Sequence, residues 1–116
     1  MHDLTQRLTV SQPIIMGGTE PTAEELRKRV EEMAYVLVKF TETRGGTELG
    51  FALNQDASDV SAADFEQGKG VVHVEGNLIL NDDPVTVIAD IDLATLKGTG
   101  RLALRETSAA AANGVA

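Results

Sequence analysis

The stretch from Val71 to Leu93 reads VVHVEGNLIL-NDD-PVTVIADIDL, with apolar residues on every second position on both sides of an Asn-Asp-Asp-Pro turn. Alternation with a period of two is typical of a strand that buries one face. Asparagine, aspartate and proline between two such runs indicate a turn. The stretch therefore predicts a β-hairpin, in which we expect Val72 to pair with Leu93.

Two upstream runs, residues 34–43 and 47–54, also alternate and predict a second hairpin. Matching their apolar faces pairs Val38 with Phe51. Both hairpins would then present one apolar and one mostly polar face.

The remaining strands are predicted at the two ends of the chain. Residues 4–11 alternate and read as a first strand. A turn at Lys97-Gly98 would pair Leu93 with Leu102 and add a third strand to the last hairpin.

A short helix is predicted to begin after Thr22. Thr22 followed by Glu25 three residues later is a capping-box pattern. Leu26, Val30 and Met33 then share one helical face, which we expect to pack on the sheet.

The element order predicts an α+β fold, with a curved, mostly antiparallel sheet of about six strands on one short helix. This order (strand, helix, two strands, loop, three strands) resembles cystatin-like and hotdog-like folds in outline. We expect one domain over residues 1–106 and a flexible tail over 107–116. Residues 55–69 interrupt the alternation, and we expect a helical turn carrying Phe65 there.

Composition excludes several functions. The chain has 116 residues, 18 acidic and 10 basic, and a net charge of −8, which disfavours nucleic acid and anionic membranes. It has no cysteine, so disulfides and cysteine-ligated metals are excluded. No signal peptide or membrane-spanning run is recognisable, and we expect a cytoplasmic protein without a cofactor.

The outer face of the last hairpin carries a group of ionisable side chains. The expected register places His73 opposite Asp92 and Glu75 opposite Asp90. Such a group is able to bind a divalent metal or to perform acid–base chemistry. The alternative is a solvated face on which Arg105, expected beside Asp90, and Arg101, expected diagonal to Asp92, neutralise the acids. In either case, nearby carboxylates should raise the pKa of His73.

Apolar residues also fall on faces that should point outward. Tyr35, Leu37, Ile79 and Ile88 would form an apolar surface suited to protein contacts. Because one short helix covers little of the sheet, the leading hypothesis is a non-enzymatic interaction or accessory protein. It would form a homo-oligomer or dock on a protein partner through its sheet surfaces.

Two alternatives remain open. Small residues at Gly76 and Ala89 would leave room between helix and sheet, which suits a carrier of a small apolar ligand. The other is an enzyme that uses the face around His73.

Overall fold

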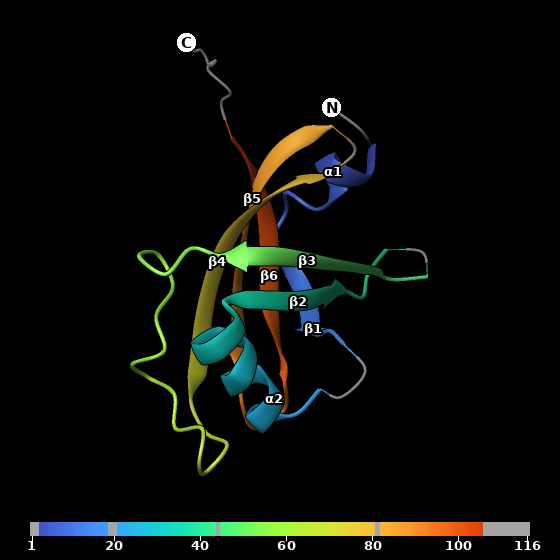
Figure 1. Cartoon of the computed structure of the whole chain (residues 1–116). Helices are drawn as coiled ribbons and strands as arrows, with labels where there is room; N and C mark the ends of the chain where they lie inside the picture. Colours follow the sequence, from blue (N-terminus) through green and yellow to red (C-terminus); the bar gives the residue numbers. More distant parts are fainter. Residues whose placement is uncertain (1–2, 19–20, 44, 81, 106–116) are drawn as a thin grey trace.

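The computed structural model describes residues 3–18, 21–43, 45–80 and 82–105 (Figure 1). Its elements, in chain order, are α1 (Asp3–Arg7), β1 (Gln12–Met16), α2 (Ala23–Lys28), a π-helical turn η1 (Arg29–Met33), β2 (Tyr35–Phe40), β3 (Thr47–Leu53), β4 (Val71–Leu80), β5 (Asp83–Asp92) and β6 (Lys97–Leu104). The strands form a closed barrel in the order β1-β2-β3-β4-β5-β6, and every pairing is antiparallel. The antiparallel, sheet-rich fold with one short capped helix is confirmed. The expected curved sheet closes into a barrel, through a short pairing of β3 with β4.

The barrel interior is filled by side chains that the alternation predicted to be inside. Valine dominates, as expected for β-branched residues on a pleated surface. The largest fully buried side chains are Phe40, Phe51, Leu8, Ile14, Leu26, Ile91, Leu102, Val36, Val38, Val72, Val74 and Val85. Burying this apolar surface is the main source of stability for a chain of this size.

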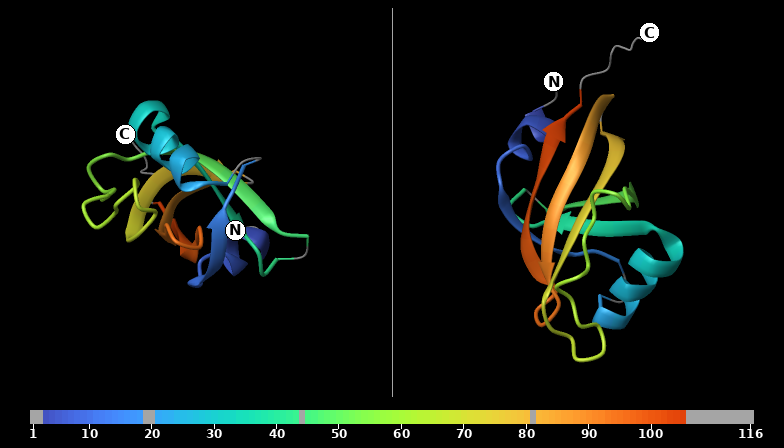
Figure 2. Two further views of the ribbon diagram at one scale, coloured as in Figure 1. Left: turned by 90° about the horizontal axis from the view of Figure 1, so that it is seen from below. Right: turned by 90° about the vertical axis from the view of Figure 1, so that its left-hand side faces the viewer.

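Helix α2 lies at one end of the barrel and α1 at the opposite end (Figures 1 and 2). The predicted cap of α2 is confirmed, because the backbone N–H of Glu25 donates to the Thr22 side chain at 3.0 Å. Leu26 and Val30 are buried as expected. No helix among the described residues has the length and apolar character needed to cross a membrane.

Met33 is not part of the buried stripe, contrary to expectation. The helix widens into η1, so the 3.6-residue spacing that placed Met33 with Val30 no longer holds. Ala34, with φ 52°, then ends the helix in a left-handed conformation. Met33 is left 56% exposed beside the start of β2.

The predicted first strand, residues 4–11, is wrong. Its beginning forms α1, and the first strand is the later run Gln12–Met16. Thr5 and Leu8 are both fully buried, and a spacing of three places both on one face of a helix but on opposite faces of a strand. Pro13, which follows the strand predicted over residues 4–11, pairs with Thr99 within β1.

The last hairpin has a different register from the one predicted. Val72 pairs with Ile91 instead of Leu93, a displacement of two residues. The reason is a tighter turn, in which Leu80 pairs with Asp83 and Asp82 takes a positive φ of 70°. Aspartate tolerates this left-handed conformation, which two-residue hairpin loops require.

Two other pairings are displaced as well. Val38 pairs with Leu49 instead of Phe51, and Leu102 pairs with Val87 instead of residue 93. Because every displacement is an even number of residues, each side chain stays on its predicted face. The inner and outer faces were therefore predicted correctly although the registers were wrong.

Strands β3 and β4 meet over a short seam, where Ala52 pairs with Asn77 and Leu53 with Gly76. A Cβ atom at Gly76 would collide with the Ala52 carbonyl oxygen and the Phe51 ring. Glycine in a strand often marks such a close approach of another backbone. Beyond this seam β2 and β3 cross β4, β5 and β6 steeply (Figure 1).

Residues 107–116 lie outside the described residues. The predicted flexible tail and the domain boundary at residue 106 therefore stay predictions.

Candidate functional site

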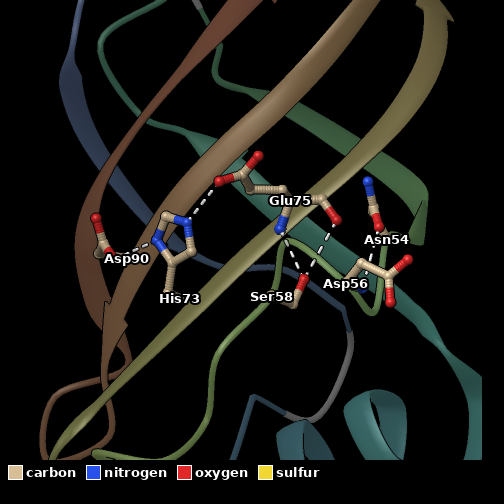
Figure 3. Close-up of polar contacts among 6 residues, drawn as sticks. All are labelled: Asn54, Asp56, Ser58, His73, Glu75 and Asp90. Atoms are coloured by element: carbon tan, nitrogen blue, oxygen red, sulfur yellow. Dashed lines mark hydrogen bonds and ion pairs between the residues drawn. The ribbon is translucent and has the colours of Figure 1, made fainter.

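His73 on β4 lies between two carboxylates (Figure 3). Its Nε2 is 2.7 Å from Glu75 Oε2, and its Nδ1 is 2.7 Å from Asp90 Oδ1. Glu75 shares the outer face of β4 with His73, and Asp90 is the residue paired with His73 on β5. The predicted grouping of His73, Glu75 and Asp90 is thus present, with different cross-strand partners.

Asp92 lies outside this group. It pairs with Val71 and Lys97, and its carboxylate accepts a hydrogen bond from the backbone N–H of Ala94 at 2.8 Å. The two-residue displacement of the register places Asp92 opposite Val71, whereas it was predicted to lie opposite His73.

The arginines expected to neutralise these acids lie elsewhere. Arg101 pairs with Ile88, and Arg105 donates to the carbonyl oxygens of Val85 and Leu78. The acids beside His73 are therefore partnered by the imidazole itself, which corrects the sequence-based expectation.

The hydrogen bond to Glu75 raises the pKa of His73, and Asp90 adds to the shift, while partial burial opposes it. The predicted rise in the pKa of His73 is confirmed. The pKa of Asp59 is lowered, mainly because its carboxylate accepts hydrogen bonds from Ser61, with a smaller contribution from the charge of His73. When it is protonated, the His73 ring lies between the carboxylates of Glu75 on its own strand and Asp90 on β5, and its charge also acts on Asp59 of the neighbouring segment.

This geometry suits an ion-pair cluster better than a metal centre. Both ring nitrogens of His73 already face carboxylate oxygens. Among the described residues, no group of three or more His, Cys, Asp or Glu side chains is arranged to hold a metal ion.

The cluster adjoins the long connection between β3 and β4, residues 54–70, which we call the strap. Its Asp59 and β4's His73 exchange backbone hydrogen bonds of 2.8 and 2.9 Å. The Ser58 hydroxyl accepts from the backbone N–H of Glu75 at 3.0 Å (Figure 3). The strap therefore continues along the edge of β4 where β3 has ended.

The expected helical turn within the strap is not formed. Residues 59 and 61 make a side-chain-to-backbone turn, in which the Asp59 carboxylate accepts from the Ser61 N–H at 2.8 Å. Such local bonds compete with helix formation. Phe65 still packs against the core, partly buried.

The apolar residues predicted to face outward do lie on the outside of the barrel. Tyr35 is 43% and Ile79 is 68% exposed, and the side chains of Leu37 and Ile88 are half-buried. We call these four residues the docking face.

The pairings place the docking face on β2, β4 and β5, with β3 between the first two. Tyr35 heads a row that runs across the sheet through Ala52, Asn77 and Thr86. Leu37 and Ile79 each lie two residues along their strands on one side of this row, and Ile88 lies two residues along its strand on the other side. Met33, which was predicted on the buried face of the helix, adds exposed apolar surface just before Tyr35 in the chain.

The space proposed for an apolar ligand is filled. Gly76 pairs with Val87, and Ala89 pairs with Val74 rather than with Gly76. Both small residues are buried, and the Phe51 ring packs where a side chain at Gly76 would lie. The carrier alternative therefore loses the observation that motivated it.

The chain is thus a small antiparallel barrel with an ion-pair cluster and exposed apolar side chains on its outer face. The chain belongs to the core binding factor beta subunit family, whose family model matches residues 19–116. It is thus related to proteins that act as one subunit of a binding factor, and the expectation of a protein-binding role is confirmed at this level. No curated protein matches the chain significantly.

Proposed function

We propose that this protein is a non-enzymatic subunit that binds a partner protein through the docking face. The observation that carries the proposal is the exposure of Tyr35 on β2 and Ile79 on β4, the two strands that flank β3, on one outer surface. Membership of a family named for a subunit supports it.

The residue types of the docking face suit a protein contact. Tyr35 is the one tyrosine of the chain, and it presents a ring with a polar hydroxyl. Tyrosine is enriched at protein interfaces because it buries apolar area and makes a hydrogen bond at low entropic cost. Its pairing partner Ala52 and the diagonal neighbour Gly50, over which the ring lies, are small and leave the ring accessible as an anchor.

The charge of the chain favours a basic partner of different sequence over a second copy. Two copies, each with a net charge of −8, repel one another at long range. A positively charged partner is attracted instead, which speeds association and discriminates among partners. Self-association through the docking face is the competing outcome.

Capture of the partner from an extract of the native host, compared between variants, tests the proposal. Replacing Tyr35 and Ile79 together by alanine should weaken retention by about tenfold or more, since central anchors carry most of the binding energy. Val71→Ala is the matched control, because Val71 is 42% exposed on the same strand as Ile79 but at its opposite end.

Chemical cross-linking and mass spectrometry of the retained complex would identify the partner and the contact residues. Equal retention by the double variant and by wild type would refute the docking face. A chain that sediments as a monomer and retains no protein would refute the proposed function.

A further inference from the structure

One edge of β3 is left open inside the barrel wall. β3 pairs with β2 from Thr47 to Ala52, but with β4 only at Ala52 and Leu53. On the side away from β2, residues 47–51 therefore have no strand partner among the described residues. An unpaired edge presents backbone donors and acceptors to any extended chain that approaches it.

The hydrogen bonds at the end of β3 show which residues face the open side. The Leu53 N–H donates to Ala34 O at 2.8 Å, toward β2, and the Asn54 N–H donates to Glu75 O at 2.7 Å, toward β4. Backbone groups alternate in direction along a strand. Odd-numbered residues of β3 thus face β2, and the N–H and C=O groups of Glu48 and Gly50 face the open side.

The open edge lacks the usual protection against strand pairing. Residues 47–51 (TELGF) contain no proline or lysine. Their one charged side chain, Glu48, turns toward the segment that follows β1, where its carboxylate accepts from the Gly18 N–H at 3.0 Å. Gly50 adds no side chain that would hinder an approaching backbone.

Groups suited to hold an added strand flank this edge. The Tyr35 side chain lies over Gly50, where a Cβ atom would collide with the tyrosine hydroxyl. That hydroxyl has no hydrogen-bond partner within the part of the chain that the structure describes. Ile79, on the part of β4 that diverges from β3, is 68% exposed and offers apolar contact.

We infer that the open edge of β3 receives an extended, basic segment of the partner protein, which adds a strand beside Glu48 and Gly50. The inference rests on the proposed function and specifies how the docking face is used. Main-chain pairing supplies affinity in this mode, and side chains on alternate positions supply specificity. The net charge of −8 favours a segment rich in lysine or arginine over the edge of a second copy.

Amide hydrogen exchange by NMR, with a synthetic peptide as probe, tests the inference. The probe is a peptide of about eight residues in which lysine alternates with valine, and its control carries N-methyl groups on alternate amides. In the free protein the amides of Glu48 and Gly50 should exchange faster than those of Leu49 and Phe51. The probe should slow both by about tenfold or more, and the methylated control should bind at least about tenfold more weakly.

A second arm uses the captured partner and a matched pair of variants. Glu48→Pro removes one N–H from the open edge, whereas Glu48→Ala removes the same carboxylate and keeps the N–H. Retention of the partner should fall about tenfold in Glu48→Pro relative to Glu48→Ala. The melting temperatures of both variants should show that they are folded.

Several results would overturn the inference. The inference fails if the amides of Glu48 and Gly50 exchange slowly in the protein without peptide. It also fails if the methylated peptide binds as tightly as the probe, or if the probe does not bind. Protection that grows with protein concentration alone would assign the edge to a second copy. The two Glu48 variants could retain the partner equally well while the Tyr35 and Ile79 double variant loses it. That result would refute strand addition at the edge of β3 and leave the proposed function standing.

Discussion

The main chains of Asp59 and His73 exchange two hydrogen bonds, of 2.8 and 2.9 Å, that fasten the strap to β4. The same His73 places its ring between Glu75 and Asp90. One residue thus joins the strap, β4 and β5, in a part of the barrel wall that β3 does not reach. This arrangement makes the stability of the wall sensitive to the charge of one imidazole.

Stability should fall as the pH rises past the pKa of His73. Because the folded-state pKa is raised above the unfolded value of about 6.5, the contribution is fully present below that value and is lost above the folded pKa. We expect the urea concentration at the unfolding midpoint to decrease as the pH rises from about 6.5 through the raised pKa of His73, and NMR titration of His73 to show that raised pKa. His73→Gln should lose this pH dependence. If the stability of the His73→Gln variant depended on pH in the same way as that of wild type, the role of the cluster would be contradicted.

Removing the Ser58 hydroxyl should loosen the strap. Ser58→Ala deletes the acceptor of the Glu75 backbone N–H, a loss worth about 1 kcal/mol. Amide exchange should accelerate mainly in the strap and along the facing part of β4. Ser11→Ala is the control, since Ser11 is exposed on the connection before β1. Uniform acceleration throughout the barrel would argue against a local fastening.

Substitution at the seam between β3 and β4 should be severe. Gly76→Ala places a methyl group against the Ala52 carbonyl and the Phe51 ring, so we expect about 3 kcal/mol of destabilisation in urea unfolding. At Gly100 a Cβ would meet its nearest neighbour, Ile14 Cγ2, at 3.2 Å, so Gly100→Ala should cost less. Equal costs at the two glycines would contradict the tight seam.

The cap of α2 offers a smaller, separate test. Thr22→Ala should cost about 1 kcal/mol, because the Glu25 N–H loses its acceptor. Thr22→Ser keeps an oxygen at the same place and should retain most of that stability. Urea unfolding of the pair measures the difference, and identical losses would argue against the capping bond.

The inner and outer faces of the strands were predictable because alternation survives an even displacement of register. The registers themselves were not, since they depend on turns such as the one at Asp82, whose positive φ allows a tighter loop than expected. The start of α1 was misread because short runs fit helical and strand periods alike. No pattern in the sequence indicated the backbone pairing of His73 with Asp59, because it joins a strand to an irregular segment.

Hydrogen–deuterium exchange of the isolated complex, compared with the free protein, is the most direct test of docking on a partner protein. Binding through the docking face should slow exchange in β3 around Gly50 and in β4 around Ile79, and leave the strap around Asp59 unchanged. Protection confined to the strap, or a complex whose exchange in β3 and β4 equals that of the free protein, would contradict the account.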